Sequence, residues 1–140
     1  MLKSLIKLLT ERKEEPIVIT EKSEEFQNPK NILLLRQDRI GDVLISIPFV
    51  KKLREICPNA NIEVVLSHRN SNIGSAINNY IDGVYILKKG IMGYFKLLKQ
   101  LRSNNYNIVI DLLDNSSTTS SIIIRYTKSD IKFGFKKKNK

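Results

Sequence analysis

The residues best suited to chemistry lie in one short charged segment, Arg36-Gln37-Asp38-Arg39-Ile40-Gly41-Asp42. An aspartate on a rigid element facing a cleft can act as a general base, taking a proton from a substrate hydroxyl as that hydroxyl attacks. Guanidinium groups bind phosphate or carboxylate on a substrate. The segment therefore offers Asp42 as a catalytic base, with Arg36 and Arg39 as groups that hold an anion.

Each of these side chains also has a structural explanation. Asp42 falls in the first turn of an expected helix, where a carboxylate meets free N–H groups and the positive end of the helix dipole. The two roles are compatible, because the helix end keeps the carboxylate ionised while making it a weaker base. The arginines could equally pair with Asp38 at the surface, where an ion pair contributes little. We expect Gly41 to let the backbone bend sharply before Asp42.

Other motifs are weaker or absent. The segment before Asp42 matches neither G-x-G-x-x-G nor G-x-x-x-x-G-K-[ST], which counts against a dinucleotide or P-loop triphosphate site there. His68, the only histidine, follows an expected strand and is a candidate substrate contact, although a lone exposed histidine is more often incidental. Asp111 and Asp114 could form a carboxylate pair, but the Asn115-Ser116-Ser117-Thr118 run equally indicates helix capping.

Alternating strands and helices position these residues. We expect strands at Ile32–Leu35, Asn61–Leu66, Gly83–Leu87, Asn107–Leu112 and Ile131–Phe135, and helices at Asp42–Cys57, Asn70–Tyr80, Tyr94–Arg102 and Ser116–Tyr126. That order predicts an α/β, Rossmann-like fold with a mostly parallel, doubly wound sheet. Ligands gather at the carboxyl ends of such strands, so the candidate edges are Arg36–Asp42, Ser67–Asn70 and Asp111–Ser117.

The chain divides into residues 1–29 and a globular part, residues 30–140. Apolar residues from Leu2 to Leu9 fall at helical spacing among lysines, which predicts an amphipathic helix compatible with an anionic membrane surface or with packing on another part of the protein. A polar linker, Glu14 to Pro29, follows. No apolar run approaches the roughly 20 residues that span a bilayer, so we expect no transmembrane helix.

Positive charge gathers in the globular part. The net charge is +10, and residues 125–140 carry seven Lys/Arg against one Asp/Glu. Such a balance suits an anionic partner, such as a phosphorylated lipid, a membrane surface or a nucleotide, although a basic solvated surface explains it as well. Basic residues are not interleaved with aromatic ones, so we do not expect nucleic acid as a partner.

Four segments together resemble the N-terminal domain of glycosyltransferase family 9, the lipopolysaccharide heptosyltransferase family. They are ILLLRQDRIGDVLISIP at 32–48, REICPNANIEVV at 54–65, YNIVIDL at 106–112 and IKFGF at 131–135. The resemblance covers residues 30–135, nearly all of the globular part. Its most specific element is D-R-I-G-D-x-L-x-x-x-P, which ends at Pro48.

The resemblance implies half of an inverting, two-domain glycosyltransferase of the B fold. It implies that Asp42 is the catalytic base and that acidic groups of an anionic glycolipid or oligosaccharide acceptor are held near the first turn and helix. Our candidates for acceptor binding are Arg36, Arg39, Gly41, Lys51, Lys52 and His68. A nucleotide sugar such as ADP-heptose is implied as the donor substrate, and neither a cofactor nor a metal is demanded.

The same comparison implies that a donor domain is missing from these 140 residues. We therefore expect a truncated acceptor-binding domain that is inactive alone, serving lipopolysaccharide or cell-envelope synthesis once completed. The alternative is a non-catalytic module that binds anionic glycolipid or a membrane surface. Cys57, the only cysteine, cannot form an intramolecular disulfide. We expect a cytoplasmic location, with peripheral contact at the inner face of the membrane.

Overall fold

The computed structural model describes residues 28–37, 40–113 and 118–134. Five strands in this part form one sheet in the order β3-β2-β1-β4-β5, and every neighbouring pair is parallel. The strands are β1 (Asn31–Leu35), β2 (Asn61–Ser67), β3 (Gly83–Leu87), β4 (Tyr106–Asp111) and β5 (Ser129–Gly134). The α/β, Rossmann-like prediction is confirmed. The expected amphipathic helix at residues 2–9 and its linker lie outside the described residues.

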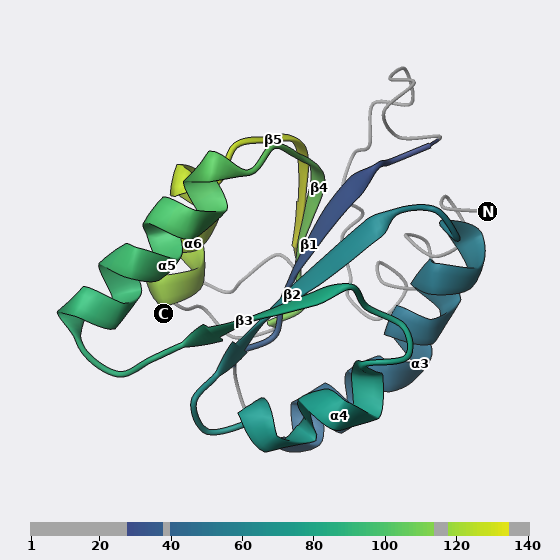
Figure 1. The fold of residues 1–140 in the computed structure, drawn as a ribbon, viewed down its shortest axis with the longest axis horizontal. Helices are drawn as coiled ribbons and strands as arrows, with labels where there is room; N and C mark the ends of the chain where they lie inside the picture. Colours follow the sequence, from purple (N-terminus) through teal and green to yellow (C-terminus); the bar gives the residue numbers. More distant parts are fainter. Residues whose placement is uncertain (1–27, 38–39, 114–117, 135–140) are drawn as a thin grey trace, which may run out of the picture.

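Helices cover both faces of the sheet (Figure 1). They are α3 (Ile40–Ile56), the short 3-10 helix η1 (Ser71–Ile73), α4 (Gly74–Ile77), α5 (Ile91–Ser103) and α6 (Thr118–Tyr126). Helices α3 and α4 pack on one face, and α5 and α6 pack on the other. The helix expected at Asn70–Tyr80 is shorter than predicted, because only η1 and α4 are helical there.

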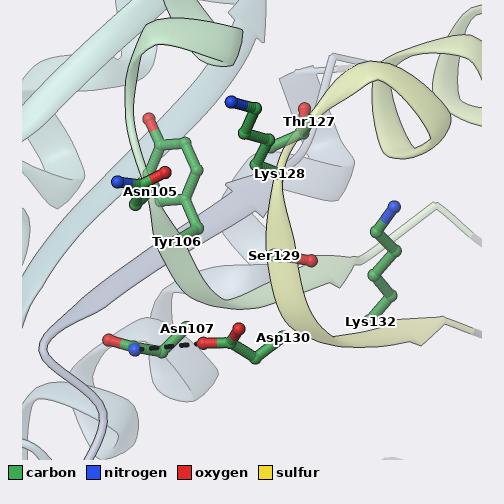
Figure 2. A pocket seen from close by; sticks show the side chains of 8 residues that line it. All are labelled: Asn105, Tyr106, Asn107, Thr127, Lys128, Ser129, Asp130 and Lys132. Atoms are coloured by element: carbon green, nitrogen blue, oxygen red, sulfur yellow. Dashed lines mark hydrogen bonds between the residues drawn. The ribbon is translucent and has the colours of Figure 1, made fainter.

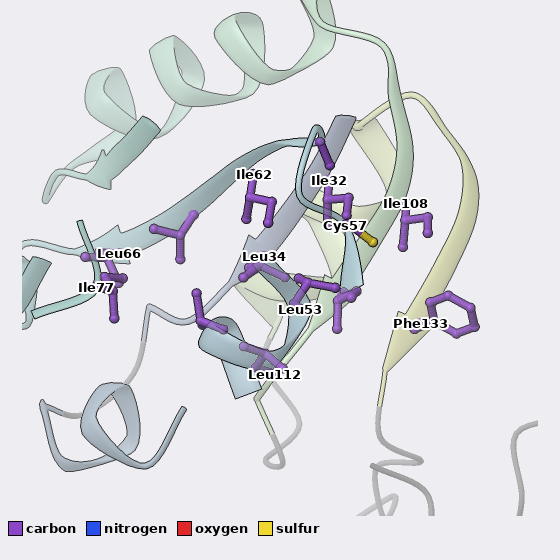
Figure 3. Close-up of a cluster of buried hydrophobic side chains, with 14 of the residues drawn as sticks. Ile32, Leu34, Leu53, Cys57, Ile62, Leu66, Ile77, Ile108, Leu112 and Phe133 are labelled. Carbon is purple, nitrogen blue, oxygen red and sulfur yellow. The ribbon is translucent and has the colours of Figure 1, made fainter. Parts of the chain in front are cut away.

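The central strand β1 is apolar throughout because both of its faces are covered. Ile32 and Leu34 belong to the cluster beneath α3, whereas Leu33 and Leu35 belong to the cluster beneath α5 and α6. All four side chains are fully buried. Figure 3 shows the first cluster, in which Leu53 of α3 meets the strands. The alternation of side chains along a strand thus makes one short run of sequence serve two cores.

Helix α3 follows the predicted apolar spacing. Val43, Val50 and Leu53 are buried, and Ile47 and Ile56 pack partly buried against the same core. The helix ends at Ile56, two residues before Pro58, as expected from the restriction that a proline places on the preceding residue.

The connections set up a topological switch point. From β1 the chain moves outward to β2 and β3 in one direction, then returns through α5 to place β4 on the other side of β1. In open parallel sheets a crevice forms outside the carboxyl ends of the two strands where the direction reverses. Here those strands are β1 and β4.

Candidate functional site

Buried polar side chains gather at the carboxyl edge of the sheet. Among the described residues the buried polar side chains are Arg36, Asn70, Asp111, Ser120 and Thr127. All but Thr127 belong to the carboxyl end of a strand, the loop after it or the first turn of the helix that follows. Buried polar groups must be hydrogen-bonded to be tolerated, so this edge is held by a specific polar network.

Arg36 is the centre of that network. It directly follows β1 and is only 8% exposed. Its Nε donates to the carbonyl oxygen of Asp42 at 3.0 Å, and one terminal nitrogen donates to the carbonyl oxygen of Leu112. The guanidinium therefore joins the ends of β1 and β4 to the first turn of α3, across the switch point.

The same guanidinium faces the carboxylate of Asp42. The other terminal nitrogen of Arg36 lies 3.6 Å from Asp42 Oδ1, and the Asp42 side chain is 35% exposed. Ser46 Oγ also donates to the Asp42 carbonyl oxygen, at 2.8 Å. Asp42 is thus anchored through its backbone while its carboxylate stays accessible to solvent beside a fixed positive charge.

Gly41 differs from its prediction. It is the second residue of α3 rather than part of a sharp bend before the helix, so the expected bend at this position is wrong. Within the described residues only Gly90 has a positive φ, and a Cβ on Gly41 would meet no atom within 4 Å. Nothing in the described part of the fold requires a glycine here. Helix propensity disfavours one.

A second loop is tied to the same point. Asn70, fully buried after β2, accepts from Ser67 N at 2.7 Å through its Oδ1 and donates to the Arg36 carbonyl oxygen at 2.9 Å. His68 lies in this loop and is exposed. The structure thus brings the Ser67–Asn70 edge beside the Arg36 segment, as the parallel sheet predicted.

The segment after β4, which is the third candidate edge, also contributes to the network. Gln37 donates to Ser120 Oγ of α6 at 2.8 Å. Asp111 is 2% exposed and accepts from Leu113 N at 3.1 Å. Asp114, its expected partner in a carboxylate pair, lies outside the described residues, as do Asp38 and Arg39.

The remaining predicted cations lie farther along α3. Lys51 and Lys52 are exposed and follow Asp42 by about two and a half turns, roughly 14 Å along the helix axis. Lys52 Nζ pairs with Glu55 Oε2 at 3.3 Å. Their roles toward an acceptor stay predictions, because no contact joins either lysine to the network at the edge.

Sequence reasoning missed Asn70, Gln37 and Ser120. The sequence predicts Asn70 as the start of a helix, although an asparagine just after a strand is a typical loop-closing residue. Gln37 was read only as part of the charged segment. No signal in the sequence pairs it with Ser120, because their contact joins positions far apart in the chain.

Figure 2 shows a pocket at the opposite edge of the sheet, near the amino ends of β4 and β5. It has a volume of about 420 Å³ and is lined by Asn105, Tyr106, Asn107, Thr127, Lys128, Ser129, Asp130 and Lys132. Asn107 Nδ2 donates to Asp130 Oδ2 at 3.4 Å, and Lys132 donates to the Ile124 carbonyl oxygen. This pocket contains no predicted site residue.

Within residues 28–37, 40–113 and 118–134, no group of three or more His, Cys, Asp or Glu side chains is arranged to hold a metal ion. None of the helices described is both long and apolar enough to cross a membrane.

Comparison with known proteins identifies relatives of one kind. Lipopolysaccharide heptosyltransferase 3 of Escherichia coli is 29% identical over 99 residues, which are 66% of this chain and 28% of that protein. Lipopolysaccharide core heptosyltransferase OpsX of Haemophilus influenzae is 26% identical over 110 residues, 79% of this chain and 31% of that protein. The resemblance to heptosyltransferases is confirmed. No protein-family model matches the sequence.

Solved structures of heptosyltransferases share the fold. A glycosyl transferase of family 9 from Veillonella parvula superposes with a TM-score of 0.64 at 22% identity, covering 77% of this chain and 32% of that one. The E. coli heptosyltransferase WaaC with ADP superposes with a TM-score of 0.60 at 20% identity, covering 74% and 34%. The heptosyltransferase-like chain therefore spans about a third or less of the length of these four proteins.

Proposed function

We propose that this chain is the acceptor-binding, N-terminal part of a heptosyltransferase-like inverting glycosyltransferase that acts in lipopolysaccharide or cell-envelope glycan synthesis. The similarity to lipopolysaccharide heptosyltransferases supports the class of reaction. The observation that carries the proposal is the Asp42 carboxylate, half-exposed at the switch point and held beside the Arg36 guanidinium.

In this proposal Asp42 is the general base. Its carboxylate takes the proton of an acceptor hydroxyl while the hydroxyl oxygen forms a bond to the anomeric carbon of a nucleotide sugar. The bond from that carbon to the diphosphate breaks in the same displacement, and the configuration at the carbon inverts. ADP-heptose is the proposed donor, in keeping with the solved WaaC structure containing ADP-2-deoxy-2-fluoro heptose. Groups outside the described residues would bind the leaving diphosphate.

Gly41 supports close approach of a ligand. Since the fold leaves open space where a Cβ would project, the missing side chain keeps a path clear beside Asp42. Glycine commonly occurs where a ligand approaches the backbone closely. We propose that the acceptor passes over this position before its hydroxyl reaches the carboxylate.

An anionic, extended acceptor fits the distribution of cations. Lys51 and Lys52 are exposed about 14 Å beyond Asp42 along α3. In this proposal the acceptor is a phosphorylated lipid A core bearing acidic sugars, whose anionic groups these lysines hold. His68 offers an exposed polar group at the neighbouring strand end.

The base is tested by an Asp→Asn change at the position equivalent to Asp42 in a complete heptosyltransferase. Loss of a general base lowers rates by about 10²–10⁴-fold. We expect kcat for heptose transfer from ADP-heptose to fall in that range, while binding of heptose-deficient lipopolysaccharide and the unfolding midpoint stay close to wild type. Near-normal turnover in the variant would refute the assigned role.

The 140-residue chain by itself gives a complementary measurement. We expect the 140-residue protein to bind heptose-deficient lipopolysaccharide by titration calorimetry but to transfer no heptose by itself. Lys51→Glu/Lys52→Glu should weaken that binding, and Arg125→Glu/Lys128→Glu is the matched control with the same net charge. Equal binding by the two variants would remove the lysines of α3 from the acceptor site.

A further inference from the structure

The outward face of α5 combines exposed apolar side chains with cations. Ile91, Met92 and Phe95 are 73%, 83% and 62% exposed. Their apolar surface is not needed for the core, because α5 packs on the sheet through Leu97, Leu98 and Leu101 instead. Large apolar side chains gathered on one turn at this exposure are typical of an interaction surface.

The cations lie on the same face. At about 100° per residue, the arc from Ile91 to Lys96 covers roughly 140° of the helix surface and also contains Phe95, Lys99 and Arg102. Lys88 and Lys89 are exposed in the turn just before the helix. Within the described part of the chain none of these five cations takes part in an ion pair.

The charge of the whole segment has one sign. Residues 83–110 contain five Lys/Arg and neither Asp nor Glu. A surface of this kind is complementary to a dense layer of negative charge and repels other basic surfaces. A second copy of this chain, with a net charge of +10, would bring like charges together.

Two glycines allow the backbone conformation of the turn that carries the apolar residues. Gly90 adopts a φ of +96°, which other residues rarely tolerate, and leads into the helix. A Cβ on Gly93 would lie 2.9 Å from Lys88 Cβ, so the helix start packs tightly on the preceding turn. Ile91 and Met92 are therefore presented to solvent by a defined backbone. Since α5 follows β3, this turn lies at the carboxyl edge of the sheet, the edge that carries Asp42.

We propose that this face of α5, here called the α5 face and comprising Ile91, Met92, Phe95, Lys96, Lys99 and Arg102 with the preceding Lys88 and Lys89, docks on an anionic phospholipid membrane. Apolar side chains enter the boundary between headgroups and acyl chains, while the long lysine side chains keep their ammonium groups among lipid phosphates. The surface goes beyond the proposed transfer reaction, because it binds lipid whether or not Asp42 is a catalytic base.

Vesicle sedimentation with the full 140-residue chain tests this surface. Vesicles of phosphatidylglycerol mixed with phosphatidylcholine should bind the protein, and vesicles of phosphatidylcholine alone should bind it far more weakly. Lys96→Glu/Lys99→Glu should weaken binding at least tenfold, from about 1 kcal/mol for each cation near an anionic surface. Arg125→Glu/Lys128→Glu changes the net charge by the same amount at residues outside the α5 face and should weaken binding much less.

The contribution of the apolar side chains to vesicle binding is tested with a matched pair of variants. Phe95→Ser should lower partitioning several-fold, whereas Tyr126→Ser, at an exposed aromatic residue of α6, should not. The proposal would be overturned if variants of the α5 face and control variants lost equal amounts of vesicle binding. It would also be overturned if binding survived every change on the α5 face. A wild-type dimer in solution that the α5 variants convert to monomers would overturn it as well, since a second copy would then be the partner.

Discussion

At the scale of single residues, Arg36 shows how one side chain can hold three elements. A buried guanidinium is costly to remove from water, and its position is justified only when its donors find acceptors. Here it bonds to the backbone beyond β4 and at the start of α3 while facing the Asp42 carboxylate. This arrangement supports a positioning role for Arg36. Its predicted contact with an acceptor stays a prediction.

Arg36→Met should destabilise the protein strongly. The change leaves the buried carbonyl oxygen of Leu112 without this donor, which costs about 1–3 kcal/mol, and removes one of the donors to the part-buried carbonyl oxygen of Asp42. We expect the free energy of unfolding, from urea titration, to fall by about 3 kcal/mol. Arg69→Met, at an exposed arginine after β2, is the control and should change stability by less than about 0.5 kcal/mol. A similar small change in both variants would contradict the network.

Gly41→Ala should affect the stability of the protein and the binding of the acceptor in opposite directions. The added methyl group meets no atom of the described protein, and alanine is the better helix former. Thermal unfolding should therefore show a gain of about 0.5 kcal/mol. Calorimetry with heptose-deficient lipopolysaccharide should show weaker binding, because the methyl group narrows the path beside Asp42. A variant that is more stable and binds equally well would leave Gly41 without a role in the acceptor site.

At the scale of elements, the carboxyl end of α3 is fixed by Arg54. Its Nε donates to the Tyr80 carbonyl oxygen at 2.9 Å, and a terminal nitrogen donates to that of Ala60 at 2.7 Å. The other terminal nitrogen lies 2.6 Å from Asp82 Oδ2, which also accepts from Ile62 N at 2.8 Å. These contacts lock α3 to the loops at the amino ends of β2 and β3. The amino end of α3 is joined separately to the switch point by the bond from Arg36 to the Asp42 carbonyl oxygen.

Asp82→Asn should show that the contribution of the Asp82 contacts to the free energy of unfolding depends on pH. The hydrogen bond from the Ile62 N–H, together with Arg54, lowers the pKa of Asp82 below that of a free aspartate. A lowered folded-state pKa stabilises the protein above the unfolded value and loses that effect as pH falls through the folded value. The wild type should therefore exceed Asp82→Asn in unfolding free energy at neutral pH, and the difference should shrink below about pH 4. A difference that is constant from pH 7 to pH 3 would exclude the linkage.

At the scale of the whole molecule, stability comes from a central strand covered on both faces and neighboured on both edges. Leu33 is fully buried under α5 and α6, and β1 pairs with β2 and β4. The outer strand β3 differs, because Val84 and Ile86 remain exposed on it. Hydrophobic burial is therefore concentrated at the switch point, where the polar network also lies.

Leu33→Ala should cost about 2–5 kcal/mol of unfolding free energy, because the cavity opens where neighbours on both faces cannot collapse into it. Val84→Ala, at the exposed edge, should cost less than about 1 kcal/mol. Urea unfolding followed by far-ultraviolet circular dichroism measures both. Equal losses would mean that the two strands contribute equally to the core.

Much of this fold could be predicted because period and composition report directly on local structure. The apolar run Ile32–Leu35 indicated a strand covered on two faces, and the three- to four-residue spacing from Val43 to Ile56 indicated α3. The prediction of a helix at Asn70–Tyr80 was only partly right, and the apolar periodicity was weakest in that segment. There the buried Asn70 side chain is committed to Ser67 N and the Arg36 carbonyl oxygen, and helix starts only after it. The hydrogen bonds of the Asn70 side chain thus explain why the helical segment begins at Ser71 rather than at Asn70, and the segment ends at Ile77 rather than at Tyr80.

The sequence by itself determined the alternation of strands and helices, and it brought Asp42 to the carboxyl edge through a helix that starts after a buried strand. Only the tertiary structure decided what surrounds that carboxylate. The contacts of Arg36 with Leu112, of Asn70 with Arg36 and of Gln37 with Ser120 join positions far apart in the chain. The face of α5 that stays uncovered was likewise decided by packing, because the spacing of Ile91, Met92 and Phe95 fits a buried stripe as well as an exposed one. Periodicity shows which residues share a face, and only the packed neighbours show which face meets water.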